Sequence, residues 1–404
     1  MADTSMSTIA GGLKRVYDDY IENQQNLKAR ASDEIGKSLT KYSPGGEGYF
    51  GAINDYGNES VGAINEAEQF RTIDSEDYQQ WKVSPKVLVA PIQFSGLVAA
   101  AAKGDDESFA NLVIEGLERA KDRLLSDENR QFFGLGTGAL AAPAASLSAA
   151  VVSFTVDSTQ YIRKNMMIDI FSGAVKTVDS MRVANVDRAN NVVYCATSLG
   201  VTVDTSTVIV KENIRDSAPS DGKEMIGLRG IVDDSTDLTT FQNLRADQIF
   251  EWRSTRINAS SANLTSDLLQ RLLDDVQVLS GLDPDMIIMH PKQRRKYLDI
   301  VVPQKRYTDQ KLDSGHAKVS FNGIDLWLDK DCQQDVVYAI NKSKLRKFEL
   351  EAMALGRHEG SDSYLRLSNY DVYQAYWRHY CNFGTSMRRA HGKIVSLAAP
   401  NGIG

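Results

Sequence analysis

The sequence predicts an α+β protein built from several modules, and three observations support this. A long amphipathic helical pattern fills residues 106–140, β-rich runs separated by turns fill residues 151–210, and helices alternate with strands in the last third. With 404 residues, of which 42% are hydrophobic, the chain can bury a substantial core. Its length favours two or three modules over one compact unit.

The N-terminal segment has a narrow apolar stripe typical of a helix that ends near Gly36. The stripe is formed by Leu13, Val16, Tyr17, Tyr20, Gln24, Leu27 and Ala31. Because so narrow a helix is marginal in isolation, we expect it to dock on the body of the subunit or on a neighbouring subunit.

Residues 43–85 are rich in glycine, acids and aromatics but have no sustained apolar period. This is too long for an ordinary loop of a compact domain, and Phe70, Ile73, Tyr78 and Trp81 argue against disorder. We therefore expect an extended two-stranded arm that lies on a neighbour. The apolar run at residues 86–94 is expected to return the chain to the body as a strand.

The pattern in residues 106–133 predicts a long helix with one buried face. Its apolar stripe includes Phe109, Leu112, Val113, Leu117, Ala120 and Leu124, while Glu118, Lys121, Asp122, Arg123 and Asp127 lie on the other side. Gly134, Gly136 and Gly138 predict a helix end and turn, and Phe132 and Phe133 are expected to pack there. A phosphate-binding loop is the alternative, but the motif follows a helix and lacks the Gly-Lys-Ser/Thr ending.

After a small-residue linker at residues 139–150, four β-rich runs predict a small barrel or sandwich inserted over residues 151–215. The runs are residues 151–156, 165–171, 191–196 and 207–210, with a hairpin turn at 187–191.

The last third predicts a sheet with packed helices. A leucine stripe from Leu264 to Val276 should end at Gly281 and lead into a strand at residues 286–289. A basic helix (291–300) and strands at 319–328, 335–341, 364–367, 373–380 and 393–397 follow.

Composition excludes several classes of protein. No window holds the ~20 apolar residues of a membrane helix, and the first residues do not form a signal peptide, so we expect a soluble, unsecreted chain with no membrane partner. Cys195, Cys332 and Cys381 are isolated and predict buried free thiols. The net charge of −7 argues against a dedicated nucleic-acid binder but permits a container.

No set of residues predicts a catalytic, cofactor-binding or metal site. The histidines (290, 316, 358, 379 and 391) lack zinc spacing, and His379 with Cys381 fits a packed strand better than a nucleophile and base. The basic run at residues 291–297 is read as a solvated helix face, with an inter-subunit ion pair or nucleic acid as alternatives. The adjacent pairs Asp233–Asp234 and Asp274–Asp275 are expected to face water.

Residues 129–138, NRQFFGLGTG, resemble the segment that closes the long spine helix of tailed-phage major capsid proteins, which have the Hong Kong 97-like fold. Other segments resemble that family in order along the chain: residues 13–17, 62–68, 227–234, 321–324 with 329–332, and 337–341. The order of the pieces makes the resemblance specific.

The resemblance implies an N-arm (1–43), an extended loop (44–90), a spine helix with part of the peripheral domain (91–150), an inserted β-subdomain (151–215), and an axial domain with chain returning to the peripheral domain (216–404). It implies a structural protein, not an enzyme, and no cofactor.

The implied partners are further copies in hexamers and pentamers of an icosahedral head, a portal at one vertex, and packaged double-stranded DNA contacted non-specifically. Because about forty residues precede the loop, a separate scaffolding protein or none is expected in place of an N-terminal scaffolding segment. A decoration protein is a further possible partner. Assembly would take place in the bacterial cytoplasm and the product would be a virion. An encapsulin-like compartment shell and a soluble α+β enzyme are the alternatives.

Overall fold

The computed structural model describes residues 31–41, 48–57, 60–72, 75–96, 110–218, 222–301, 320–356, 365–366 and 369–398. The expected N-terminal helix lies outside these residues except for its end. Helix α2 (Ala31–Gly36) ends at the predicted glycine. Residues 106–109 of the predicted long helix also lie outside.

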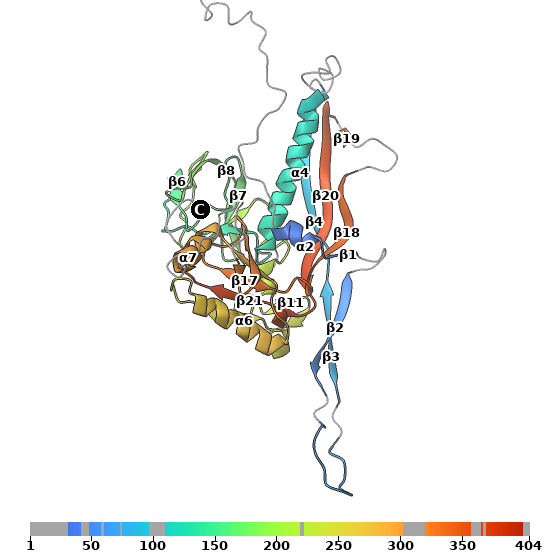
Figure 1. Cartoon of the computed structure of the whole chain (residues 1–404). Coiled ribbons are helices and arrows are strands. Elements are labelled where there is room, and N and C mark those ends of the chain that lie inside the picture. Colours follow the sequence, from blue (N-terminus) through green and yellow to red (C-terminus); the bar gives the residue numbers. More distant parts are fainter. Residues whose placement is uncertain are drawn as a thin grey trace, which may run out of the picture.

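An elongated plate forms one side of the molecule (Figure 1). Its sheet contains β1 (Leu39–Lys41), β18 (Leu345–Leu355), β20 (Val372–Thr385), β19 (Leu365–Arg366) and β4 (Lys86–Ser95), and β4 pairs with β20 over ten residues. Helix α4 (Ala110–Phe132) runs along one face, where Trp377 Nε1 donates to the carbonyl of Leu117 at 2.9 Å. The opposite face of β4 is open, and Val87 and Val89 are exposed there.

The arm is the antiparallel hairpin of β2 (Tyr49–Tyr56) and β3 (Asp77–Val83), as the sequence predicts. It projects away from the rest of the molecule in line with the plate (Figure 1). At its base Trp81 is buried. Its ring stacks on Tyr49 and meets Phe348 of β18 edge to face, so the arm is joined to the body through aromatic contacts.

The β-rich region that follows α4 forms a barrel. Its strand order is β5 (Ala139–Ala141), β10 (Thr207–Lys211), β7 (Met167–Ser172), β8 (Val175–Asp187), β9 (Val192–Cys195) and β6 (Ser153–Thr155). A bridge between Pro143 and Val156 brings β6 back to the chain that follows β5, which closes the sheet. The predicted hairpin turn at 187–191 is confirmed.

Two details of the barrel differ from the sequence predictions. The prediction of a linker at residues 139–150 is wrong for its first three residues, because Ala139–Ala141 forms a strand that pairs with β10. The longest barrel strand, β8, was not predicted. The alternation of buried and exposed side chains along β8 is interrupted at Ser180, which has a positive φ and lies where the register with β7 shifts. The two-residue period that indicates a strand is therefore lost there.

The rounded body holds a six-stranded sheet in the order β13 (Thr255–Asn258), β21 (Gly392–Val395), β17 (Val337–Ile340), β14 (Met286–Met289), β16 (Ile324–Leu328) and β15 (Ser320–Phe321). Helix α6 (Ser266–Ser280) packs beside β21 and ends at Gly281 in left-handed conformation, as predicted. Helix α7 (Pro291–Val301) follows β14. This region also contains five short elements: α5 (Leu228–Ile231), β11 (Thr240–Phe241), β12 (Leu244–Arg245), η2 (Phe250–Trp252) and η4 (Arg388–Ala390).

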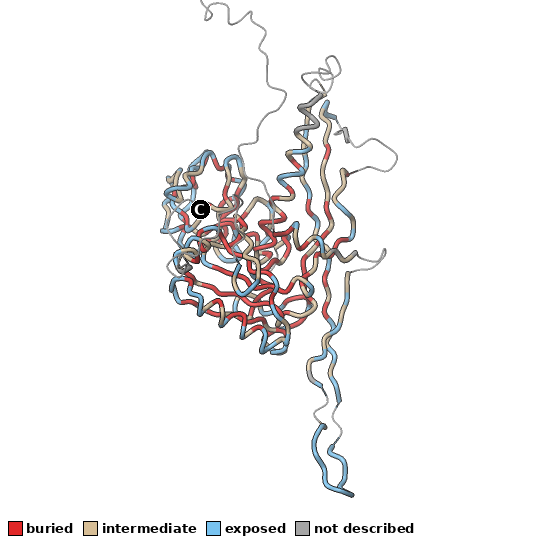
Figure 2. Tube along the Cα trace, viewed as in Figure 1, coloured by how far each residue is buried: buried red, intermediate tan, exposed pale blue. Residues whose placement is uncertain are grey.

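Burial divides the molecule sharply (Figure 2). Strand β14 sends Met286 and Ile288 into one hydrophobic cluster and Ile287 and Met289 into another, which explains its unbroken apolar sequence. The barrel has a separate core of its own. The arm is exposed along most of its length, so it contributes little to any of these cores.

Candidate functional site: the arm and the junction that holds it

Four consecutive buried side chains at the end of α4, residues 128–131, join the helix to the plate and to the body. Glu128 accepts a short contact from Lys347 of β18 and lies 3.0 Å from His379 Nδ1 of β20. Asn129 donates to Asp329 at 2.9 Å and to Asp331 at 2.8 Å. These contacts fix the helix to the plate and to the body.

The next two residues extend the junction toward the barrel side. Arg130 forms a short ion pair with Glu224, and its Nε donates to Asp127 at 3.0 Å. Gln131 accepts from the backbone N–H of Met225 at 3.1 Å. Burial would raise the pKa of Asp127, but the nearby charges of Arg130 and Lys211 outweigh it and hold that pKa below its usual range.

Two aromatics complete the helix end as predicted. Phe132 and Phe133 are fully buried, and their rings meet edge to face at 5.2 Å. Gly136 and Gly138 have positive φ and turn the chain from α4 into β5. The helix end and turn are thus confirmed, and the sequence ENRQFF at residues 128–133 is explained as four polar anchors followed by two core aromatics.

His379 and Cys381 do share a face of β20, with Sγ 3.5 Å from Nδ1. Both are buried, His379 Nε2 lies 2.8 Å from Glu349, and burial raises the pKa of the Cys381 thiol. Glu128, His379 and Cys381 are the set of described residues whose donor atoms could hold a metal, within 4.8 Å of one another. Since Glu128 already meets Lys347 and His379, a closed ionic cluster accounts for the geometry.

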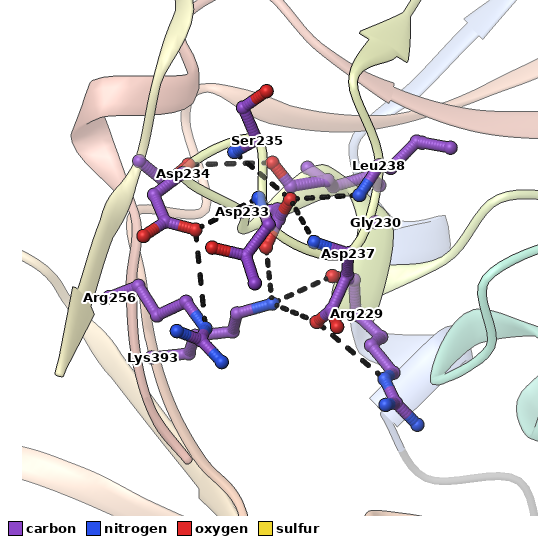
Figure 3. Close-up of polar contacts among 12 residues, drawn as sticks. Arg229, Gly230, Asp233, Asp234, Ser235, Asp237, Leu238, Arg256 and Lys393 are labelled. Carbon is purple, nitrogen blue, oxygen red and sulfur yellow. Dashed lines mark hydrogen bonds and ion pairs between the residues drawn. The ribbon is translucent and has the colours of Figure 1, made fainter. Parts of the chain in front are cut away.

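The prediction that Asp233 faces water is wrong. Asp233 is fully buried, and its carboxylate lies 2.9 Å from Lys393 Nζ (Figure 3). The other carboxylate oxygen accepts from the backbone N–H groups of Ser235, Asp237 and Leu238. Lys393 also meets Asp237, so a turn and a strand far apart in sequence are joined. Sequence reading missed this because a turn carboxylate reveals its lysine only after folding.

The remaining candidates are scattered. Asp274 is exposed, as predicted, and Asp275 is partly exposed. In α7, Arg295 is exposed, but Lys292 is buried with its ammonium 2.8 Å from Gln334, so the solvated-face reading is wrong for that residue. His290 and His391 are buried, whereas positions 316 and 358 lie outside the described residues. All three cysteines are free and buried, as predicted.

The arm, unlike the end of α4, is exposed to solvent. Every residue from Val61 to Thr72 is exposed, including Val61 and Phe70, each at 84% of its accessible surface. Exposed aromatic and β-branched residues continue down the arm to Phe50 and Tyr78. Large apolar side chains exposed on a projecting arm are typical of a protein–protein contact.

Solved structures share this architecture over nearly the whole chain. The capsid asymmetric unit of cyanophage A-1(L) matches with a TM-score of 0.62 at 9% sequence identity, covering 98% of this chain and 99% of that one. The capsid of a native GTA particle matches with a TM-score of 0.56 at 9% identity, covering 98% and 100%. This chain has the Hong Kong 97-like capsid fold.

The Hong Kong 97-like fold is not restricted to phage structures. A chain of the holo-SrpI encapsulin complex from Synechococcus elongatus PCC 7942 matches with a TM-score of 0.50 at 8% identity, covering 98% of this chain and 96% of that one. No protein-family model matches the sequence, and a search of curated proteins finds no match. Among the described helices, none has the length and apolar character needed to cross a bilayer.

Proposed function

We propose that this chain is the major capsid protein of a tailed bacteriophage, a structural subunit that packs with identical copies into an icosahedral head around double-stranded DNA. One observation carries the proposal. A chain that matches a capsid structure over 98% of its length extends an arm on which every residue from Val61 to Thr72 is exposed. Burying one large apolar side chain contributes about 2 kcal/mol, so these residues stabilise the subunit only when another molecule covers them.

The open face of the plate supplies a second surface for contact. Val87 and Val89 of β4 are exposed on the face opposite α4, and the arm continues directly from that strand. A subunit that overlaps its neighbours can therefore bury its arm against a sheet that is covered on one side only. Closed cyclic contacts of this kind, in hexamers and pentamers, would generate the shell.

The modules implied by the sequence are proposed with the same boundaries: N-arm 1–43, extended loop 44–90, spine helix and peripheral domain 91–150, inserted subdomain 151–215, and axial domain with return 216–404. Ala139–Ala141, at the end of the segment 91–150, pairs with a strand of the proposed inserted subdomain. Scaffolding and decoration proteins, a portal at one vertex and non-specific contact with DNA remain proposed partners. Assembly in the bacterial cytoplasm into a virion is proposed with them.

The test is assembly itself. Overexpressed protein, with or without a scaffold, should form closed shells visible by electron microscopy, and particles from infected cells should contain DNA. A chain that stays monomeric at every concentration and salt tested would contradict the proposal.

An encapsulin-like compartment is the second candidate, supported by the match to the SrpI chain. Particles that hold a cargo enzyme and no DNA would favour it. We infer a structural role and not a catalytic one, because the buried His379 and Cys381 already pack against carboxylates and a thioether. Catalytic conversion of a substrate by the isolated subunit would favour the alternative that the chain is an enzyme.

A further inference from the structure

One short loop of the body, residues 329–332 (the shared loop), is contacted by several other parts of the chain. It lies in the connection between β16 and β17, and Asp329, Asp331 and Cys332 are buried. The amide of Asp329 donates to the carbonyl of Met289 at 3.3 Å, which fixes the start of the loop to the end of β14. The side chains and the carbonyls of the shared loop bind different partners.

The carboxylates of the shared loop hold α2 and α4. Asp329 Oδ2 accepts from the backbone amide of Ala31 at 3.0 Å, while its Oδ1 accepts from the side chain of Asn129 at 2.9 Å. Asp331 accepts from the same Asn129 amide group at 2.8 Å. Asn129 in turn accepts from the backbone amide of Ser32 at 3.1 Å. Helix α2 is therefore bound to the loop both directly and through Asn129.

The buried carboxylate of Asp329 depends on these donors. Burial raises the pKa of Asp329, and the nearby charge of Asp331 adds to that rise. Hydrogen bonds from the amides of Asp331 and Ala31 and from the side chain of Asn129 oppose it. Because a buried charged group that loses a donor is left strongly unfavourable, the position of this carboxylate and the position of α2 depend on each other.

The backbone carbonyls of the shared loop hold the barrel. Gln160, in the segment between β6 and β7, donates from Nε2 to the carbonyls of Lys330 and Cys332, each at 2.7 Å. The hydroxyl of Tyr161 donates to the carbonyl of Asp331, also at 2.7 Å. Two neighbouring barrel side chains thus bind three consecutive carbonyls.

The two sets of contacts meet in Asp331. Its carbonyl accepts from the barrel and its carboxylate accepts from α4. Its amide donates to Asp329 Oδ1 at 2.8 Å, so the backbone of Asp331 also positions the carboxylate that holds α2. A backbone rotation that follows the barrel would therefore move both carboxylates of the loop.

The seam between the barrel and the body leaves room for such a movement. A cleft of about 610 Å³ lies there, lined by Gln160 and Tyr161, by the turn after α4 and by residues 333–335 of the body. Close-packed protein interiors contain few voids larger than a water molecule, so this seam is not close-packed. The chain enters the barrel at β5 and leaves it after β10, and the contact with the shared loop is a separate attachment.

We propose that the shared loop couples the docking of the barrel to the docking of α2. A barrel that leaves the loop loosens α2, and an α2 that leaves Asp329 loosens the barrel, because coupling between two binding equilibria is reciprocal. The N-terminal part of the chain joins the body at α2, so the barrel controls how firmly that junction is held. The inference goes beyond the proposed shell function and does not depend on it, since all these contacts lie within one subunit.

Hydrogen exchange of dissociated, full-length subunits tests the coupling. Tyr161→Phe removes the hydroxyl that binds the carbonyl of Asp331 and keeps the ring. We expect the amides of α2, and those of Asp329 and Asp331 in the loop, to exchange about fivefold faster than in the wild-type chain. Gln160→Ala, which removes two contacts with the loop, should produce a larger increase at the same amides.

Tyr297→Phe is the matched control. The hydroxyl of Tyr297 donates to the carbonyl of Ser320 at 3.1 Å, so the same substitution removes the same kind of bond from the body and leaves the shared loop untouched. Exchange in α2 should stay at the wild-type rate in this variant. The amides of β21, in the middle of the body sheet, are the internal reference and should not respond to Tyr161→Phe.

The outcomes separate coupling from a general loss of stability. Faster exchange confined to α2 and the shared loop supports the inference. Wild-type exchange of α2 in both barrel variants would overturn it. An increase that extends to β21, or one that Tyr297→Phe reproduces, would also overturn it, because the whole subunit would then be less stable. Subunits that form no particles would contradict the shell function and leave this measurement unaffected.

Discussion

The end of α4 and the tip of the arm differ in where their side chains find partners. At the end of the helix, Glu128, Asn129 and Arg130 are buried although they are polar, and each meets a group of the same chain. On the arm, Val61 and Phe70 are exposed although they are apolar. Polar residues are usually exposed and large apolar residues are usually buried, and each of the two regions reverses one half of this rule.

The difference separates folding from assembly. Buried ionic groups help to specify one arrangement of helix, plate and body, because an unpaired charge there is strongly unfavourable. Exposed apolar groups add nothing to the isolated subunit and become favourable only on contact. Variants of the body should therefore change subunit stability, and variants of the arm should change assembly.

The largest effect is expected at the ion pair of Lys393. Lys393→Met leaves the fully buried Asp233 and the partly buried Asp237 without their shared ammonium, and we expect a loss of about 3–5 kcal/mol in the free energy of unfolding. Urea denaturation of dissociated subunits measures it. Asp274→Asn, at an exposed position, should change stability by less than ~0.5 kcal/mol. A loss below ~1 kcal/mol in Lys393→Met would show that burial of this pair is overestimated.

The next largest loss of subunit stability is expected when the pH is lowered. Burial lowers the pKa of His391 to about 3 and that of His290 to about 4, from 6.5. Below pH 6.5 the unfolded chain therefore binds protons that the folded chain does not, and stability falls as the pH falls toward the folded-state values.

Between pH 6.5 and 5 we expect the free energy of unfolding to drop by about 3 kcal/mol, measured by denaturation at each pH. His391→Gln should remove about half of that pH dependence. A flat profile over this range would contradict the burial of both imidazoles. Because the described arm contains no histidine, hydrogen exchange at its tip should not follow this titration.

The base of the arm should show an intermediate effect, since it connects the two regions. A Cβ at Gly51 would overlap the indole of Trp81, so Gly51→Val must displace a buried aromatic, at a cost of about 1–3 kcal/mol. Thermal unfolding of the subunit measures this loss. Gly57→Ala is the control, because a Cβ there meets nothing within 4 Å. Equal stability of the two variants would mean that the arm is not anchored through Trp81.

The sequence predicted the regions whose signals are local. Helix α6 could be predicted from leucines at helical spacing that end at Gly281. The arm could be predicted from a long glycine-rich segment that lacks periodic apolar residues. Strand β8 escaped prediction because the bulge at Ser180 interrupts its alternation. The burial of Asp233 could not be predicted, because its partner Lys393 is 160 residues away and only the folded sheet brings them together.

The same limit applies to the end of α4. Asn129 and Arg130 could be recognised as part of a motif, but their partners Asp329 and Glu224 are 200 and 94 residues away. A polar residue in an amphipathic pattern is read as exposed unless its partner is known. Motif resemblance carried information here that periodicity could not.

The smallest effect on subunit stability is expected at the arm tip, where the comparison is sharpest. Val61→Ser replaces an apolar side chain that is 84% exposed, so unfolding of the subunit should change by less than ~0.5 kcal/mol. If a second copy buries this side chain, each contact loses about 1–2 kcal/mol, and the protein concentration needed for assembly should rise about tenfold. Light scattering over a concentration series measures that threshold. Val175→Ser, at a 65% exposed valine of the barrel, should leave both quantities unchanged. A threshold that shifts equally for both valines would mean that the arm has no special part in contact between copies, and the separation of folding from assembly would fail at its clearest point.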